Sequence, residues 1–379
     1  MHDMKSKLAQ KPVKIEDNGT LKIDDLLKLL VDKGASDLHL MVQSSPVLRV
    51  NGLLIPQKEI PPLSPDDVNE LLDQTVTKEQ RNIFDNEFEL DSAYSIAGLG
   101  RFRINALKQR GSTSIAFRLI PYNIPTIDEL ELPQICKQLI LKPRGLILVT
   151  GPSGSGKSTT LAAMINHLNK NEQRNVIMIE EPIEFLFRND KCIIHQREIG
   201  SDTMSFAKAL KHSLRHDPDV IVIGEMRDIT TISTAMSAAE TGHLVLGTLH
   251  TYDAAQSIDR IIDVFPPAQQ RQVRLQLSQV LEAVLSQSLL PRVNGGRIAA
   301  FEIMLATSVV RRLIRDEKIW EITPNIEMGT KEGSQSMNQA LANLIRNNIV
   351  AKEDAVLMSS DPVKLDSLIS SRDRFERVA

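Results

Sequence analysis

Hydrophobic residues recur at helical spacing near the start of the chain. Ile23, Leu26, Leu27 and Leu30 lie three or four positions apart or side by side, as they would on one face of a helix, and Gly34 follows them. Glycine commonly ends a helix because it adopts the left-handed conformation without strain. The pattern therefore predicts an amphipathic helix that ends at Gly34.

Alternating patterns predict strands after this helix. Residues 37–40 alternate polar and apolar side chains, and apolar runs at 47–50 and 53–55 flank the Asn51-Gly52 dipeptide. That dipeptide favours positive φ at both turn positions, so it predicts a tight hairpin. A second helical stretch is expected over residues 66–84.

A second hairpin pattern brings two arginines together. Residues 101–106 and 114–119 each alternate apolar and polar side chains, and Arg110-Gly111 lies between them. If these two residues form the turn, Arg103 lies directly opposite Arg118 on the less apolar face. Two facing cations repel each other unless an anion lies near them, so the pair is a candidate anion site. The alternative is two solvated arginines on an exposed sheet face.

The chain length and the position of its proline-containing segments indicate two domains, and 379 residues are enough for a third. Two prolines within residues 121–125 favour a short, semi-rigid linker there. The expected division is a flexible N-terminal extension (1–20), an N-terminal domain (21–120), a linker (121–126), a second domain with C-terminal helices (127–358) and a polar C-terminal tail (359–379).

Composition narrows the function classes. Apolar residues make up 42% of the chain, charged residues 25%, and the formal net charge is −3, which fits a globular protein better than a basic nucleic-acid-binding one. No apolar run is long enough to span a membrane, and the first 20 residues lack the apolar core of a secretory signal. Two cysteines, Cys136 and Cys192, are too few for a disulfide framework or a four-cysteine zinc site. We therefore expect a reducing, cytosolic environment and no zinc.

The strongest chemical pattern is a glycine-rich loop between a strand and a helix. Residues 146–150 form an apolar run, Gly151–Ser158 fits G-x-x-x-x-G-K-[ST], and a helix is expected from residue 158 to residue 168. Glycines let backbone N–H groups surround phosphate oxygens, and a helix N-terminus favours negative charge. The flanking strand and helix argue against a chance match of a Gly/Ser-rich loop.

The side chains of this loop suit a nucleoside triphosphate. Lys157 can neutralise the β- and γ-phosphates, and the Ser158 hydroxyl can ligate Mg²⁺. We therefore expect ATP as the substrate and Mg²⁺ as the cofactor. The expected nucleotide-binding residues are Gly151, Ser153, Gly154, Ser155, Gly156, Lys157, Ser158 and Thr159.

Three candidate catalytic side chains follow apolar runs further along the chain. Glu180 follows residues 176–179, Glu225 comes shortly after residues 220–223, and His250 ends a third apolar run. Ligands of parallel α/β sheets bind at the carboxyl ends of the strands, so these side chains are expected to face the nucleotide. Glu225 is also the candidate metal ligand, although many nucleotide hydrolases carry the acid one position earlier. Taken singly, each residue has the alternative of a surface acid or a structural histidine.

Together these motifs resemble those of the secretion-type ATPases that power type IV pili and type II secretion. The resemblance extends from about residue 34 to about residue 361. The matching segments are Gly34–His39, Gly100–Asn105, Gly151–Ser158, Ile179–Glu184 (the family's Asp box), Asp217–Asp228 (its atypical Walker B motif) and Thr248–Thr251 (its His box).

Within that family the chain is most similar to the pilus retraction motors, the PilT-like branch. Assembly and secretion motors carry a four-cysteine zinc insertion, for which this chain has too few cysteines. Val309–Asp316 occupies the place of a helix motif typical of the retraction branch, and it matches that motif in part. The same segment is also an amphipathic helix pattern. Glu181 is a second departure, because the Asp box usually has Asp at that position.

The resemblance implies a fold and an arrangement of the site. The expected fold is α/β, with an N-terminal PAS-like α/β domain and a C-terminal RecA-like P-loop NTPase domain, assembled as a homohexamer. Glu180 is similar to the family's water-activating acid, Glu225 to its Mg²⁺-associated acid, and His250 to the residue that faces the γ-phosphate. Arg103 and Arg118 match its arginine fingers, which close onto the phosphates.

The implied function is an ATP-hydrolysing motor that retracts type IV pili in twitching motility. The implied partners are an inner-membrane platform protein and, as an option, a paralogous retraction ATPase. The ring would be cytoplasmic and peripheral to the inner membrane at the pilus base, with no nucleic-acid partner. Two alternatives stay open: a pilus assembly or type II secretion ATPase, and an accessory retraction subunit with weak intrinsic ATPase activity.

Overall fold

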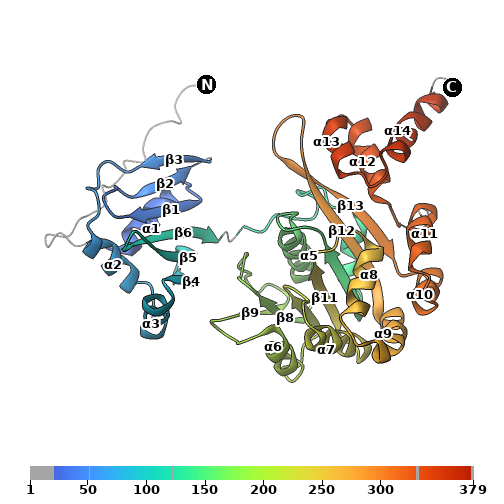
Figure 1. Ribbon diagram of the computed structural model, residues 1–379, viewed down its shortest axis with the longest axis horizontal. Coiled ribbons are helices and arrows are strands. Elements are labelled where there is room, and N and C mark those ends of the chain that lie inside the picture. The colour runs from blue at the N-terminus through green and yellow to red at the C-terminus, as the bar shows by residue number, and fades with distance from the viewer. Residues whose placement is uncertain (1–20, 51, 121–122, 330–332, 377–379) are drawn as a thin grey trace. The chain divides into compact units, whose positions relative to one another are not determined.

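The computed structural model describes residues 21–50, 52–120, 123–329 and 333–376, with only the backbone described over 371–376. The expected extension over residues 1–20, and Asn51 of the first predicted hairpin, lie outside these ranges. A boundary between two compact units falls between residues 122 and 123 (Figure 1). Both units combine helices with a sheet, so the predicted α/β class is confirmed.

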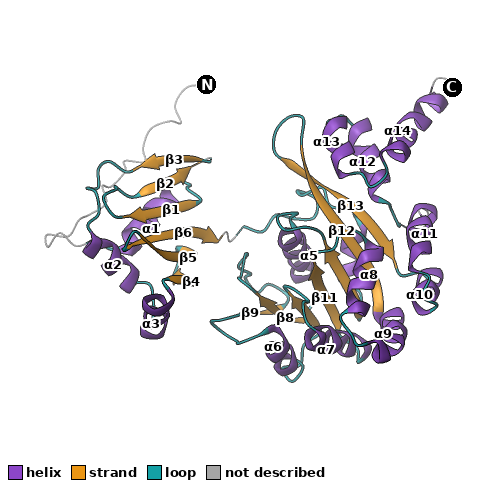
Figure 2. Ribbon diagram, in the orientation of Figure 1, coloured by secondary structure: helices purple, strands orange, loops and turns teal. Residues whose placement is uncertain are grey.

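The N-terminal unit contains a six-stranded antiparallel sheet in the order β3-β2-β1-β6-β5-β4 (Figure 2). Apolar residues of its helices and of the inner faces of its strands form one core. The elements are α1 (Ile23–Asp32), β1 (Asp37–Met41), β2 (Val47–Val50), β3 (Leu53–Pro56), α2 (Pro65–Asp73), α3 (Lys78–Glu87), β4 (Glu89–Ile96), β5 (Gly100–Gln109) and β6 (Ser112–Ile120).

The predicted arginine hairpin is confirmed in turn and register. Arg110 and Gly111 have φ of 50° and 77°, and Arg103 on β5 is aligned with Arg118 on β6. Positive φ at both central residues matches the right-handed twist of the two strands, so this turn fixes the register.

One predicted helical stretch is two helices. The prediction of a continuous helix over residues 66–84 is wrong, because α2 ends at Asp73 and α3 begins at Lys78. Thr77 starts the second helix through a capping box: its hydroxyl accepts a hydrogen bond from the N–H of Gln80 (3.2 Å), and the Gln80 side chain accepts one from the N–H of Thr77 (2.9 Å). This local hydrogen bonding outweighs the continuing helical pattern.

The C-terminal unit contains a seven-stranded sheet in the order β13-β12-β7-β11-β10-β8-β9. Neighbours from β12 to β9 are parallel, and β13 is antiparallel to β12. Its elements up to β13 are α4 (Ile135–Ile140), β7 (Gly145–Thr150), α5 (Lys157–Asn171), β8 (Asn175–Glu180), β9 (Ile193–Glu198), α6 (Phe206–Ser213), β10 (Val220–Ile223), α7 (Ile229–Glu240), β11 (Leu244–Leu249), α8 (Ala254–Asp263), α9 (Pro267–Val280), β12 (Leu281–Pro291) and β13 (Arg297–Leu305).

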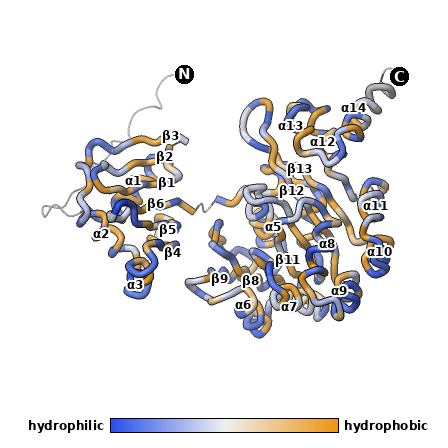
Figure 3. Tube along the Cα trace, viewed as in Figure 1, coloured by the Kyte–Doolittle hydropathy of each residue, from blue (hydrophilic) through white to orange (hydrophobic). Residues whose placement is uncertain are grey.

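Central strands of this sheet are apolar on both faces. Leu146 and Leu148 of β7 belong to one core, whereas Ile147 and Val149 belong to another, so alternate residues pack against helices on opposite sides. Figure 3 shows the resulting hydrophobic stretches within the sheet. Burial on both faces explains why these strands read as continuous apolar runs in the sequence.

Helices follow the sheet and extend into the segment expected to be a tail. They are α10 (Ser308–Arg315), α11 (Ile322–Met328), α12 (Met337–Arg346), α13 (Lys352–Met358) and α14 (Pro362–Glu376), with a 3₁₀ turn, η1 (Ile319–Glu321), before α11. Leu365 of α14 is fully buried and packs with Leu341 and Ala342 of α12. Leu368 and Ile369 of the same helix are partly buried and pack against this cluster, so the polar composition of residues 359–379 hides an apolar face. Across the described residues, every helix falls short of the length and hydrophobicity that a membrane span requires.

Candidate nucleotide-binding site

The site predicted from the C-terminal half of the sequence gathers at one edge of the sheet. The glycine-rich loop follows β7, Glu180 ends β8, Glu225 follows β10 and His250 follows β11. These four strands are neighbours in the order β7-β11-β10-β8 and run parallel. Their carboxyl ends therefore meet at the same edge, as expected for a ligand site in a parallel α/β sheet.

Two glycines of the loop have no room for a side chain. Gly151 and Gly156 have φ of 141° and 92°. A Cβ atom at Gly151 would lie 2.3 Å from the backbone oxygen of Gln287, and one at Gly156 would lie 2.9 Å from the Gln287 Nε2. Both the backbone conformation and the close approach of β12 therefore require glycine here.

Gln287 is a site residue that the sequence analysis missed. This buried side chain of β12 donates a hydrogen bond through Nε2 to the Ser155 carbonyl (2.6 Å), and its Oε1 accepts one from the Thr160 hydroxyl (2.8 Å). It thus ties the loop to the first turn of α5. The only trace of this role in the sequence is a run of polar residues, 286–288, within the apolar strand.

Lys157 is the first residue of α5, and its ammonium group lies back on the loop. Its Nζ donates to the carbonyl oxygens of Gly151 (2.7 Å) and Pro152 (3.0 Å). Burial lowers the pKa of Lys157, while the nearby carboxylates Glu225 and Glu184 oppose that shift. The lysine is therefore held at the loop by carbonyl oxygens, with negative charge close by.

The loop fits a phosphate group. The buried Ser155 hydroxyl has no hydrogen-bond partner among the described residues, and α5, which is 15 residues long, begins directly after Gly156. A helix N-terminus with a lysine in its first turn attracts an anion. Ser153 and Gly154 are exposed on the loop, and Ser158 and Thr159 are half-buried in the first turn of α5.

His250 connects Lys157 with Glu225. Its Nε2 lies 3.2 Å from Glu225 Oε2, and its Nδ1 lies 3.5 Å from Lys157 Nζ. An ammonium group can only donate, so Nδ1 is the acceptor and Nε2–H donates to Glu225. Glu225 also pairs with the guanidinium of Arg227. Burial acts to raise the pKa of Glu225, but the hydrogen bonds from Arg227 and His250 outweigh it and hold that pKa below its ordinary value.

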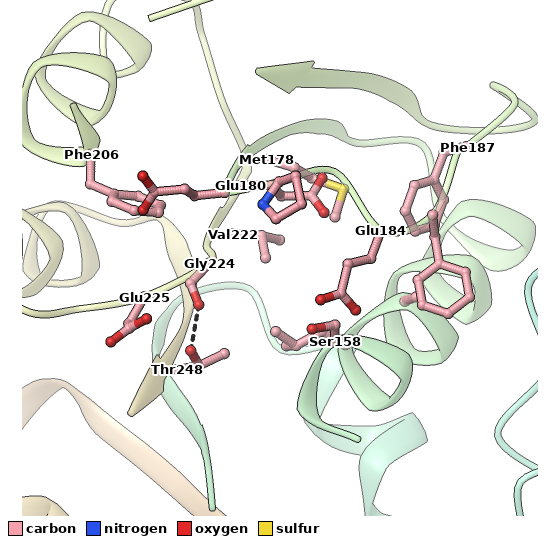
Figure 4. Close-up of a pocket in the computed structure, with 15 residues that line it drawn as sticks. Ser158, Met178, Glu180, Glu184, Phe187, Phe206, Val222, Gly224, Glu225 and Thr248 are labelled. Carbon is pink, nitrogen blue, oxygen red and sulfur yellow. Dashed lines mark hydrogen bonds between the residues drawn. The ribbon is translucent and has the colours of Figure 1, made fainter. Parts of the chain in front are cut away.

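Glu180 faces a small pocket beside the loop. Ser158, Glu184 and Glu225 line the pocket together with it (Figure 4). The apolar lining of this pocket includes Met178, Phe185, Phe187, Phe206 and Val222. Burial raises the pKa of Glu180 to about 7, and the charges of Glu184 and Glu198 add to the shift. A hydrogen bond donated by Gln196 Nε2 to Glu180 Oε1 (3.0 Å) opposes it.

Packing explains why the acid after β10 stands at position 225. A Cβ atom at Gly224 would lie 3.0 Å from the carbonyl oxygen of Ile179 and 3.3 Å from Cα of Glu180. The Gly224 carbonyl accepts a hydrogen bond from the Thr248 hydroxyl, which holds this turn against β11 (Figure 4). A side chain at position 224 would press on the neighbouring strand.

Glu181, the departure from the Asp box, is exposed, and its charge acts on Arg227. The carboxylates of Glu225 and Glu181 both raise the pKa of Arg227, with the Glu225 hydrogen bond as the largest cause. Arg227 therefore pairs with the acid of one loop and is close enough to the acid of another for its charge to act on it.

Arg103 and Arg118 each have a carboxylate partner in the N-terminal unit. Arg118 Nε donates to Asp37 Oδ1 (2.7 Å), and Arg103 Nη2 donates to Asp91 Oδ1 (3.3 Å). These acids offset the repulsion between the aligned arginines. The side chain of Arg118 is still 70% exposed and that of Arg103 is 43% exposed, so both guanidinium groups have N–H groups that face solvent.

The fold and the site together define a class of protein. A parallel sheet that carries a glycine-rich loop, a lysine, carboxylates and a histidine at one edge is typical of an α/β nucleotide-binding protein. Residues 20–355 match the sequence profile of a family described as "Type II/IV secretion system protein". The chain belongs to this family.

Two of the relatives are type IV pilus ATPases. The chain is 43% identical over 335 residues to the type IV pilus retraction ATPase PilT of Pseudomonas aeruginosa, which covers 88% of this chain and 97% of that protein. It is 42% identical over 337 residues to the type IV pilus ATPase PilU of the same species, covering 89% and 88%. A crystal structure of the pilus retraction motor PilT with bound ADP superposes with a TM-score of 0.85 at 44% identity, covering 91% of this chain and 99% of that one. The resemblance to retraction ATPases drawn from the motifs is confirmed.

Proposed function

We propose that this protein is an ATP-hydrolysing motor that drives retraction of type IV pili. The observation that carries the proposal is the gathering of Lys157, Glu180, Glu225 and His250 at one sheet edge beside the glycine-rich loop. Similarity to PilT over 97% of that protein's length supports the direction of the motor.

In this proposal the C-terminal unit is a RecA-like ATPase domain and the N-terminal unit is a PAS-like domain. ATP binds with its phosphates in the loop, where the backbone and the residues Gly151, Ser153, Gly154, Ser155, Gly156, Lys157, Ser158 and Thr159 surround them. Ser158 and Glu225 would hold Mg²⁺, which supplies positive charge next to the phosphate oxygens.

The chemical step uses the chain's own side chains. Lys157 exchanges its neutral carbonyl partners for phosphate oxygens, because charged acceptors bind an ammonium group more strongly. Glu180 orients the attacking water and accepts its proton, and the bond from the γ-phosphorus to the bridging oxygen breaks in line. His250 is placed to sense the γ-phosphate, since it contacts both Lys157 and Glu225.

Coupling to movement uses both units. We propose a homohexameric ring in which closure of the two domains brings Arg103 and Arg118 to the phosphates. Loss of the γ-phosphate removes negative charge, weakens these contacts and lets the domains reopen. Cycles around the ring would turn an inner-membrane platform protein from the cytoplasmic side, at the pilus base.

The comparison with the relatives leaves one alternative to be tested. The identities to PilT and PilU are 43% and 42%, so similarity does not separate a primary motor from an accessory one. An accessory retraction subunit would hydrolyse ATP weakly by itself and faster with its paralogue. A pilus assembly or secretion motor would share the chemistry but not the direction. Deletion of the gene distinguishes these cases: hyperpiliated, non-twitching cells support retraction, and cells without pili support assembly.

Replacing Lys157 tests the site assignment. Lys157→Ala removes the charge that faces the β- and γ-phosphates, so steady-state ATPase activity is expected to fall by about 100-fold or more. Circular dichroism and thermal unfolding should stay close to those of the wild type. Lys170→Ala, an exposed lysine near the end of the same helix, is the matched control. Turnover that survives the loss of Lys157 would show that the site is assigned wrongly.

A further inference from the structure

Gln196 lies beside Glu180 on the same face of the sheet. In the parallel pair β8 and β9, Met178 is aligned with Gln196 and Glu180 is aligned with Glu198. Alternate side chains of a strand share a face, so all four point to one side. Gln196 is therefore the diagonal neighbour of Glu180, close enough for a long side chain to reach it.

Three hydrogen bonds fix the Gln196 amide. Its Nε2 donates to Glu180 Oε1 (3.0 Å) and to the Phe185 carbonyl (2.7 Å), and its Oε1 accepts from the Phe187 N–H (3.0 Å). Carboxylate and carbonyl oxygens accept only, and a backbone N–H donates only, so these partners allow one orientation of the amide. One side chain thus holds both the Glu180 carboxylate and the loop that follows β8.

The charges around Glu180 make this donor important. Glu198 of β9 is 5% exposed and faces Glu180 across the strands, and Glu184 comes from the following loop. Glu181 and Glu225 line the same pocket, and Lys157 of α5 is close enough to Glu184 and Glu225 to feel their charges. Against the nearby carboxylates, the amide of Gln196 and the backbone N–H of Glu184 stabilise the ionised form of Glu180.

We propose that Gln196 is a positioning residue for ATP hydrolysis: its amide N–H holds the Glu180 carboxylate in place and in the ionised form that accepts a proton from the attacking water. The proposal rests on the role of Glu180 in the proposed function. Water oxygen bonds to the γ-phosphorus, its proton passes to Glu180, and ADP leaves with the electron pair of the broken bond. Gln196 itself exchanges no proton in this step.

Two variants test the role of this amide. Gln196→Met removes the donor without adding charge, and Gln196→Glu keeps the size and the acceptor for Phe187 but adds a carboxyl group. Removal of a hydrogen bond to a charged group changes proton affinity about tenfold or more, so the Glu180 titration midpoint should rise by about one unit in Gln196→Met and further in Gln196→Glu. At pH 7 kcat should fall about fivefold in Gln196→Met and further in Gln196→Glu, recover towards the wild-type value in alkali, and leave the KM for ATP within about twofold.

The titration of Glu180 is measured by two methods, and one of them does not depend on ATP turnover. Infrared difference spectra between each protein and the same protein carrying Glu180→Gln follow the Glu180 carboxyl band against pH, and the pH profile of kcat follows its effect. Gln339→Met is the matched control, because Gln339 also donates to a backbone carbonyl (Glu327, 3.2 Å) and accepts from a backbone N–H (Ser336, 2.8 Å). Among the described residues it has no hydrogen bond to a carboxylate. It should keep the wild-type midpoint.

The outcomes separate a positioning role from a structural one. A midpoint that rises in the order wild type, Gln196→Met, Gln196→Glu supports the proposal. A kcat lowered equally at every pH, with an unmoved carboxyl band, overturns it. If the wild-type protein does not hydrolyse ATP at all, the proposed function fails, and the infrared midpoint still decides whether Gln196 controls the Glu180 carboxyl.

Discussion

At the scale of single residues, one histidine links the lysine of the phosphate loop to an acid of the site. His250 accepts from Lys157 on one side and donates to Glu225 on the other. Anything that draws the Lys157 ammonium towards a phosphate therefore also changes the surroundings of the His250 ring, and through it those of Glu225. Through these two contacts, a bound γ-phosphate would affect Glu225, the acid that follows β10.

The raised pKa of Glu180 predicts a pH dependence. A pKa of about 7 means that Glu180 is protonated below this pH and cannot accept a proton from water. The kcat of the wild-type protein should fall about tenfold per pH unit below 7 and level off above it. In Glu180→Gln, kcat should fall about 10²–10⁴-fold and lose this acidic limb. Steady-state ATPase assays from pH 5.5 to 9 measure both. A Glu180→Gln variant that keeps the acidic limb would assign that limb to another group.

Residue contacts divide into those the sequence could predict and those it could not. The alignment of Arg103 with Arg118 follows from strand alternation and the turn at Arg110-Gly111, because both are local patterns. The acids that bind these arginines, Asp37 and Asp91, come from other strands and left no local pattern. The same holds for Gln287 and Gln196, whose partners lie far away along the chain or on a neighbouring strand. Side-chain pairs of this kind become visible only once the sheet order is known.

At the scale of elements, burial on both faces made the central strands easy to predict. β7, β8 and β10 appear as the expected apolar runs, because each packs between two layers of helices. The predicted positions of Glu180 and Glu225 followed from these strand ends. The limit of α3, which depends on one polar cap, was not predicted correctly, and α14, which packs through a few apolar residues, was expected only as part of a polar tail. Composition and periodicity are averages over several residues, so they do not detect a helix that depends on one cap or on a few apolar contacts.

Glu302 joins two elements through a buried carboxyl group. It lies on β13, is 6% exposed, and accepts a hydrogen bond from the N–H of Ala254 (2.8 Å) at the start of α8. Burial raises its pKa to about 7, against an ordinary value of 4.5. The folded protein therefore keeps a proton that the unfolded chain releases between these two values. The contribution of Glu302 to stability should therefore decrease as the pH rises from about 4.5 to about 7 and stay level above.

Glu302→Gln removes this dependence, because its amide stays neutral at every pH. The free energy of unfolding of the variant relative to the wild type should rise across pH 4.5–7 by at most about 1.4 kcal/mol per pH unit. Each kcal/mol corresponds to a rise of about 2–4 °C in the melting temperature. Thermal unfolding at half-unit steps measures the difference. Glu353→Gln, an exposed glutamate at the start of α13, should show no such trend. A difference that is constant with pH would mean that Glu302 is not protonated in the folded protein.

At the scale of the whole molecule, the proposed chemistry needs residues from both units. The phosphate loop belongs to the C-terminal unit, whereas Arg103 and Arg118 belong to the N-terminal one. Neither unit alone then contains every charge that the reaction uses. In this proposal ATP hydrolysis depends on how the two units are arranged. This dependence couples the chemical step to a movement of one unit relative to the other.

Replacing the two arginines tests this division. Arg103 is 43% exposed and pairs with an exposed acid, so its ion pair contributes little to stability. Arg118 is 70% exposed, and its buried partner Asp37 keeps Arg49 (3.8 Å) and the Ser36 hydroxyl (2.7 Å). The fold should therefore survive Arg103→Ala or Arg118→Ala. Loss of an arginine that stabilises the transition state should lower kcat by about 10³–10⁵-fold. Nucleotide binding, followed with a fluorescent ATP analogue, should weaken far less, because the loop and Lys157 lie in the other unit.

The matched control is another arginine of the N-terminal unit. Arg81 of α3 also forms ion pairs, with Asp73 (2.6 Å) and Asp85 (3.1 Å), but it is not part of the aligned pair. Arg81→Ala should therefore keep the wild-type kcat, while its thermal stability falls with the loss of both ion pairs. If Arg103→Ala and Arg118→Ala behave like Arg81→Ala in both respects, the N-terminal arginines act only within their own sheet. ATP hydrolysis would then be complete within the C-terminal unit, and the charge lost with the γ-phosphate would have no partner in the N-terminal unit to release.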